Sequence, residues 1–184
     1  MPQQLPTGFN DQPWIGRDFK TTGILVLGES WYGDWGAEYN SDASYIQAYL
    51  DGKLSDRMYT KIANACQSSK ESFWQSVMFT NLVIWAGASS KDRPTTHMYL
   101  DGYFRLRRLL EKYKPRGVWL LGKEQAQFSS HLLISEEIPF STSVHPTAVG
   151  VTTAHLSQSW QELLTKLART QGSNSKASAK RSEI

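Results

Sequence analysis

The sequence has almost no cysteine, no histidine pair at a common metal-binding spacing and no long apolar run. Its 184 residues include one cysteine, Cys66, which excludes an internal disulfide and any zinc or iron–sulfur site that needs four cysteines. The four histidines show no H-x-x-x-H spacing, so we expect neither a metal nor any other cofactor. No apolar stretch approaches the roughly 20 residues that span a bilayer, so we expect no membrane partner.

What the sequence does contain is typical of one globular domain. Hydrophobic residues make up 40% of the chain and charged residues 20%, and the length allows a sizeable core. We assign residues 1–170 to this domain and residues 171–184, which are small, polar and basic, to a disordered tail. The polar N-terminus has no features of a secretory signal, so we expect a cytoplasmic protein, and we expect it to be a monomer. The net charge of +3 permits a polyanionic partner without requiring one.

Short apolar runs alternate with helical patterns along the chain. The apolar runs predict strands at residues 23–28, 77–84, 117–122 and 138–144. Helical patterns lie at residues 44–50, 57–66, 98–113, 123–132 and 156–168. Because strands that alternate with helices form a parallel sheet covered on both sides, we predict an α/β fold. The expected architecture is a three-layer α/β/α arrangement with a central four-stranded parallel sheet.

Three side chains suited to chemistry stand where predicted strands end. Glu29 directly follows the run GILVLG, which stops at Gly28, and Asn81 lies within the apolar segment VMFTNLVIW. His145 follows the fourth run. In open α/β sheets, ligands bind just beyond the carboxyl ends of the strands. We therefore expect Glu29, Asn81 and His145 to face a common cleft.

Each of these side chains also has a purely structural interpretation. Glu29 could lie at the start of a helix, where the macrodipole favours an acid. Asn81 could hold a loop in place, because an unpaired buried amide costs on the order of 1–3 kcal/mol. His145 precedes Pro146, so it takes an extended or turn conformation and, by itself, would usually be structural. Their shared position at successive strand ends favours a site over coincidence.

Four segments resemble motifs of the uracil-DNA glycosylase superfamily, and together they cover about residues 23–167. GESWYGD is similar to the first motif of that superfamily, and FTNLV to the strand whose asparagine recognises the flipped base. PRGVWLLGKEQA is similar to its third strand and the helix that follows, and SVHPTAVG to its His-Pro-Ser loop, which enters the minor groove. The resemblance implies the fold of that superfamily and a metal-independent DNA glycosylase that flips its target base into a pocket. DNA is then the expected partner.

The resemblance also implies roles for individual residues. The catalytic candidates are Glu29, which would orient water or stabilise the cationic sugar, and His145, which would donate a hydrogen bond to the departing base. The base-binding candidates are Asn81, which carries both donors and an acceptor, with Ser30, Trp31 and Tyr32 beside it. The DNA-binding candidates are Thr147, Val149, Lys123, Lys91 and Arg93, with Val149 as a wedge in the gap left by the base. We interpret the run RLRR at residues 105–108 chiefly as a solvated helix face.

The chain departs from the family pattern at several positions, so it resembles a divergent member. Trp31 stands where proline is common, and Ser30 stands where the efficient uracil-excising members carry aspartate. Thr147 replaces the usual serine and keeps its hydroxyl. The sequence therefore leaves open which base is excised: uracil, another deaminated base, or a larger modified pyrimidine such as a modified cytosine in viral DNA. The choice between a role in DNA repair and one in phage defence is open as well.

Two other functions fit parts of the sequence. Ser30 in place of aspartate favours a non-catalytic binder or sensor of modified DNA on the same fold, which would bind tightly without forming product. The modest charge favours a small-molecule hydrolase acting on a nucleoside, although neither a G-x-S-x-G nor a G-x-x-x-x-G-K-[ST] motif occurs. Such a hydrolase would show no steep dependence of DNA affinity on salt, whereas a DNA-binding protein would.

Overall fold

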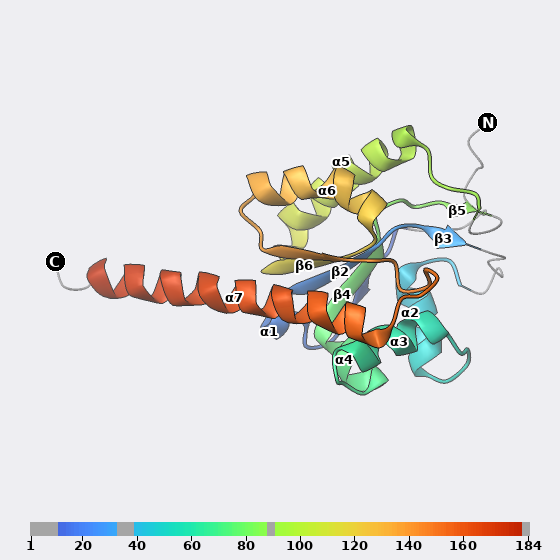
Figure 1. The fold of residues 1–184 in the computed structure, drawn as a ribbon, viewed down its shortest axis with the longest axis horizontal. Coiled ribbons are helices and arrows are strands. Elements are labelled where there is room, and N and C mark those ends of the chain that lie inside the picture. The colour runs from blue at the N-terminus through green and yellow to red at the C-terminus, as the bar shows by residue number, and fades with distance from the viewer. Residues whose placement is uncertain (1–10, 33–38, 88–90, 182–184) are drawn as a thin grey trace.

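A five-stranded sheet forms the centre of the molecule, with helices packed on both of its faces (Figure 1). The computed structural model describes residues 11–32, 39–87 and 91–181. In spatial order the strands are β1 (Trp14–Ile15), β4 (Val77–Asn81), β2 (Ile24–Gly28), β6 (Gly117–Leu121) and β7 (Phe140–Ser143). Four of these strands, β4, β2, β6 and β7, run parallel to one another. The prediction of an α/β fold is therefore confirmed.

The edge strand β1 makes the sheet mixed instead of purely parallel. β1 pairs antiparallel with β4, so that Trp14 lies opposite Phe79, and the Trp14 indole N–H donates to the carbonyl of Trp74 at 2.6 Å. The predicted four-stranded parallel sheet is correct for β4, β2, β6 and β7, but the whole sheet has five strands. A two-residue strand shows no periodic pattern, which is why the sequence did not reveal it. A second, two-stranded parallel sheet, formed by β3 (Trp31–Tyr32) and β5 (Ala86–Gly87), was missed for the same reason.

Side chains of the central strands contribute to two separate hydrophobic cores, because successive side chains of a strand point to opposite faces of the sheet. Leu25 and Leu27 of β2 lie in the core under α5 (Thr96–Tyr113) and α6 (Lys123–Ser135). Val26 lies in the core under α2 (Asp42–Leu50), α3 (Arg57–Ala65), α4 (Lys70–Ser76) and α7 (Thr153–Arg181). Burial on both faces explains why these strands are continuous apolar runs.

The helices differ from the sequence prediction mainly at their ends. α2 begins at Asp42 because Ser41 caps it, with its hydroxyl accepting the Ser44 backbone N–H at 3.1 Å. α1 (Phe19–Thr22) and α4 were not predicted. α7 continues to Arg181 and extends beyond the sheet in Figure 1, through most of the segment for which the sequence predicts a disordered tail. Disorder of that tail stays a prediction.

The carboxyl ends of the parallel strands meet at one edge of the sheet. Gly28 at the end of β2 is paired with Asn81 at the end of β4, and Leu121 of β6 is paired with Ser143 of β7. The small sheet of β3 and β5 and the loop between β7 and α7 lie at this same end of the molecule (Figure 1). This edge therefore gathers residues that are far apart in the sequence.

Candidate active site

A cavity of about 470 Å³ lies at the carboxyl ends of the parallel strands. Gly28, Asn81 and Leu121, each at the end of a strand, form part of its wall. The loop that follows β7 contributes His145 and Thr147. Two of the three residues expected to face a common cleft, Asn81 and His145, therefore line one cavity.

Asn81 is almost completely buried, and its amide is held from two sides. Its Nδ2 donates to Oδ1 of Asp42 at 3.1 Å, and its backbone N–H donates to Oδ2 of Asp42 at 3.3 Å. On the other side, Oδ1 of Asn81 lies against Gly28, where an added Cβ would come within 2.3 Å of that oxygen. Since an amide carries two N–H donors and an acceptor oxygen, the second Nδ2 N–H and Oδ1 can still serve a ligand.

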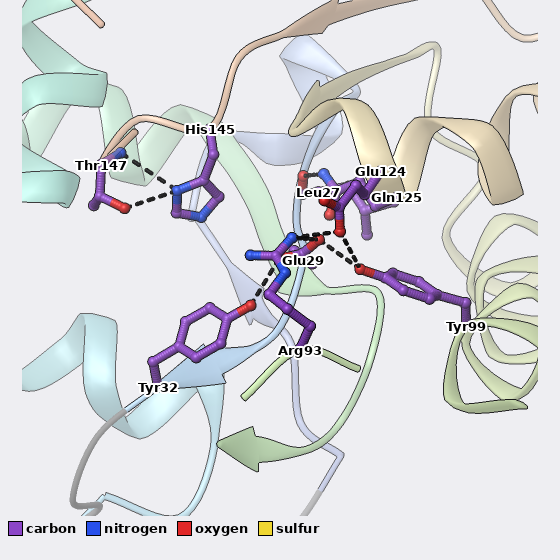
Figure 2. Close-up of polar contacts among 9 residues, drawn as sticks. All are labelled: Leu27, Glu29, Tyr32, Arg93, Tyr99, Glu124, Gln125, His145 and Thr147. Carbon is purple, nitrogen blue, oxygen red and sulfur yellow. Dashed lines mark hydrogen bonds and ion pairs between the residues drawn. The ribbon is translucent and has the colours of Figure 1, made fainter. Parts of the chain in front are cut away.

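His145 presents a neutral imidazole whose remaining donor is Nε2–H. The Thr147 backbone N–H donates to Nδ1 of His145 at 3.3 Å, and the Thr147 hydroxyl lies 2.9 Å from the same nitrogen (Figure 2). A neutral ring whose Nδ1 accepts a hydrogen bond carries its proton on Nε2. Burial lowers the pKa of His145, the Glu29 carboxylate opposes that shift, and the Arg93 guanidinium adds to it. The ring is therefore uncharged at neutral pH.

Glu29 is 2% exposed, and both of its carboxylate oxygens accept hydrogen bonds. Oε1 accepts from the Tyr99 hydroxyl at 2.6 Å and from the Arg93 guanidinium at 2.7 Å, and Oε2 accepts from the Tyr32 hydroxyl at 2.8 Å (Figure 2). Burial raises the pKa of Tyr32 to about 12 and also raises that of Tyr99, so both phenols keep their protons and donate. Among the described residues, Glu29 is not one that lines the cavity, whereas its partner Tyr32 is.

Arg93 bridges two carboxylates. The same guanidinium nitrogen that contacts Glu29 also donates to Oε2 of Glu124 at 2.6 Å, near the start of α6. Arg93 was predicted to bind DNA phosphates, but the structure places it beside the candidate catalytic acid. Its side chain is 43% exposed, so it remains accessible from solvent.

Aromatic side chains form much of the cavity wall. The Trp31 and Tyr45 rings meet edge to face, with their centroids 5.1 Å apart. The ring centroids of Tyr45 and Tyr59 are 5.5 Å apart. Tyr59 is 1% exposed, and its hydroxyl has no hydrogen-bond partner among the described residues. Ser30, another predicted base-binding residue, also lines the cavity, as do Trp31 and Tyr32. A buried hydroxyl that lacks a partner is a position where a polar ligand group would be stabilised.

The loop after β7 has an exposed apolar tip and a fixed base. Val149, the residue predicted to be a wedge, is fully exposed. Lys61 of α3 donates from Nζ to the carbonyls of Pro146 at 2.7 Å and of Val151 at 2.6 Å, on either side of that tip. Of the other DNA-binding candidates, Thr147, Lys91 and Lys123 are exposed.

Several residues that support this site were not predicted from the sequence. Asp42 contacts Asn81, Tyr99 contacts Glu29, and Lys61 holds the loop, yet no motif or spacing marks them. The interpretation of residues 105–108 as a solvated face is wrong for Arg105, which is 6% exposed. Arg105 donates to the carbonyl of Asn81 at 2.7 Å and pairs with the carboxylate of Asp11. Arg105 is one of three arginines in the run RLRR, and nothing in the sequence distinguishes the buried one from its exposed neighbours.

Two classes of site are not found in the part of the chain that the structure describes. There, no group of three or more His, Cys, Asp or Glu side chains is arranged to hold a metal ion. None of the described helices is long and apolar enough to cross a membrane. A comparison with models of known protein families finds no match, and a comparison with curated proteins finds none either.

Proposed function

We propose that this protein is a monofunctional DNA glycosylase, which hydrolyses the N-glycosidic bond of a flipped-out pyrimidine and leaves an abasic site. The observation that carries the proposal is the convergence of the Asn81 amide and the His145 imidazole on one aromatic-lined cavity at the strand ends. The resemblance of the surrounding motifs to the uracil-DNA glycosylase superfamily supports the same function. The proposal includes the fold of that superfamily.

The chemistry follows from the two side chains that line the cavity. A base flipped into it would meet the donor and acceptor of Asn81 on one polar edge. As the N-glycosidic bond breaks, its electron pair moves onto the base, and Nε2–H of His145 donates to a base oxygen on which negative charge builds. Water then bonds to C1′ of the oxocarbenium-like sugar and releases its proton to solvent.

Glu29 is better placed to stabilise charge than to remove a proton from water. Its two oxygens already accept from three donors, and the cavity is lined by its partner Tyr32 and not by Glu29 itself. Its negative charge is close enough to influence the titration of His145. A fixed buried carboxylate of this kind favours a cationic sugar in the transition state.

The size of the cavity supports a base larger than uracil. A pyrimidine with eight heavy atoms occupies about the volume of five water molecules, each of which takes about 30 Å³ in the liquid. The cavity of about 470 Å³ is several times larger than that. Three polar residues, Ser55, Asp56 and Arg57, also line the cavity. We therefore include modified pyrimidines with a polar substituent among the candidate substrates.

A binder of modified DNA without catalysis is the second candidate. It is favoured by Ser30, which offers only a hydroxyl where an acid would activate water, and by the three hydrogen bonds that the Glu29 oxygens already accept. Such a protein would capture a flipped base in the same cavity and release it unchanged.

Incubation with oligonucleotides tests the two candidates. Oligonucleotides carrying uracil, other deaminated bases and modified cytosines are incubated with the purified protein and then cleaved in alkali. We expect cleavage at one class of base, and its loss in Asn81→Ala and His145→Ala but not in the control His131→Ala, which changes an exposed histidine on α6. Full activity in a double Asn81→Ala, His145→Ala variant would refute the glycosylase. Tight binding without cleavage would favour the second candidate.

A further inference from the structure

Asp42 is a buried carboxylate that the chemistry described above does not use. It is the first residue of α2 and is 1% exposed. Its Oδ2 accepts from the Thr80 hydroxyl at 2.7 Å and from the Asn81 backbone N–H at 3.3 Å, and its Oδ1 accepts from Asn81 Nδ2 at 3.1 Å. All three donors belong to the last two residues of β4, so a single carboxylate holds the end of that strand.

A buried arginine fixes the same two residues from another direction. The Arg105 guanidinium donates to the Thr80 hydroxyl at 2.8 Å and to the Asn81 carbonyl at 2.7 Å. An arginine only donates, so the Thr80 oxygen must accept from it, and the Thr80 proton must then point to Asp42. The direction of every hydrogen bond in this group is thereby determined.

This group leaves Asn81 only one orientation of its amide. A carboxylate only accepts, so Nδ2 of Asn81 must face Asp42, since the reversed amide would bring its oxygen against the carboxylate. The Asn81 oxygen instead lies against Gly28, where the missing Cβ provides the space. The order of donor and acceptor that Asn81 presents to the cavity is therefore set outside the cavity.

We propose that Asp42 is the positioning residue that determines which pyrimidine edge Asn81 accepts. This inference rests on the proposed function. A 4-keto pyrimidine offers an N–H at position 3 and an oxygen at position 4, whereas a 4-amino pyrimidine offers an acceptor and an amino group in the opposite order. An amide of fixed orientation matches one order and opposes the other. An amide free to turn over matches both.

The first test compares the two edges in the variant Asp42→Asn. The new side chain has the same shape but carries its own N–H donors, so Asn81 can turn its oxygen toward it. Rates of base release are measured on paired oligonucleotides that differ only in a 4-keto or a 4-amino base with the same substituent. We expect the preference between the two bases to fall by about tenfold in Asp42→Asn. Asp51→Asn, an exposed change at the other end of α2, should leave the preference unchanged.

An equal loss of rate on both bases, with the preference intact, would show that Asp42 has only a structural role and would overturn the inference. If the wild-type protein releases no base, the proposed glycosylase fails, and the same preference is then measured as a ratio of affinities for the two oligonucleotides. Failure of the two proposals is therefore distinguishable.

A second measurement is made on the wild-type protein and does not need Asp42→Asn, in case that variant does not fold. The side-chain NH₂ resonances of Asn81 are assigned by their absence in Asn81→Asp. We expect two separate signals, one of them shifted downfield and protected from exchange with solvent by its hydrogen bond to the carboxylate. Two unprotected signals that exchange with each other would show a mobile amide and would overturn the inference.

Discussion

Substitution of Gly28 by alanine tests the tightest contact in the site. The new Cβ would lie 2.3 Å from Oδ1 of Asn81 and 3.2 Å from both Cγ of Asn81 and Cζ of Phe79. Carbon and oxygen atoms that are not bonded to each other rarely approach so closely, so the Asn81 amide must retreat by about 1 Å to reach an ordinary contact. The amide cannot retreat freely, because its Nδ2 and its backbone N–H are both bound to Asp42.

The expected magnitude comes from the hydrogen bond that this movement breaks. A buried hydrogen bond to a charged acceptor contributes about 1.5–3 kcal/mol. Alanine is better than glycine inside a strand by about 0.5–1 kcal/mol, which offsets part of the loss. We therefore expect the free energy of unfolding of Gly28→Ala to fall by about 1–2 kcal/mol. If the protein acts as proposed, displacement of the Asn81 amide should lower the rate of base release by at least about tenfold.

Urea unfolding and alkaline cleavage of the oligonucleotide measure the two effects separately. Gly172→Ala is the matched control, because an added Cβ on Gly172 meets nothing within 4 Å and that residue lies on α7, outside the cavity. The control should keep wild-type activity. Wild-type stability together with wild-type activity in Gly28→Ala would refute the reasoning, since Asn81 would then not be held against Gly28.

Three further predictions concern other parts of the site. Asp42 is fully buried, and burial raises its pKa from 3.8 to about 6, so between about pH 4 and 6 the folded protein holds more protons than the unfolded chain. Its contribution to stability should fall by about 3 kcal/mol as the pH rises through that range, and parallel stability–pH curves for wild type and Asp42→Asn would contradict this. Lys61→Met removes two hydrogen bonds to the loop that carries Val149, so activity on duplex DNA should fall about tenfold more than activity on single strands, whereas exposed Lys53→Met should change neither. Tyr59→Phe removes a buried hydroxyl that lacks a partner among the described residues. The free energy of unfolding of the free protein, measured with urea, should therefore rise by about 1 kcal/mol, and binding of a substrate with a polar substituent should weaken. Unchanged binding would show that this hydroxyl does not contact the substrate.

The strands and the edge that holds the site could be predicted from the sequence, because both follow from local patterns. The apolar runs that end at Gly28 and Asn81 correspond to β2 and β4, since strands buried on both faces must be continuously apolar. The second apolar run extends to residue 84, yet the strand ends at Asn81, because the chain bends at Leu82 and Val83. The strand-end rule therefore identified two cavity residues, Asn81 and His145.

The partners of those residues could not be predicted, because they come from distant segments and resemble ordinary surface residues. Asp42 follows a serine at a helix start, a position where an acid is common for reasons of capping and the macrodipole. Arg105 is one of several basic residues on an amphipathic helix, and only packing decides which of them is buried. Glu29 was expected to face the cleft, but Arg93 and Tyr99 bind its oxygens from other elements. Local sequence patterns carry no information about such pairings.

The division of the interior into two cores gives the protein an uneven optical signal. Of the six tryptophans that the structure describes, five lie in the core beside the cavity (Trp14, Trp31, Trp74, Trp119 and Trp160), while Trp85 lies in the opposite core. The fluorescence of these six side chains therefore reports mainly on one face of the sheet. Since Trp31 also lines the cavity, entry of an aromatic ring there should quench part of that emission, without any label attached to the protein or the DNA.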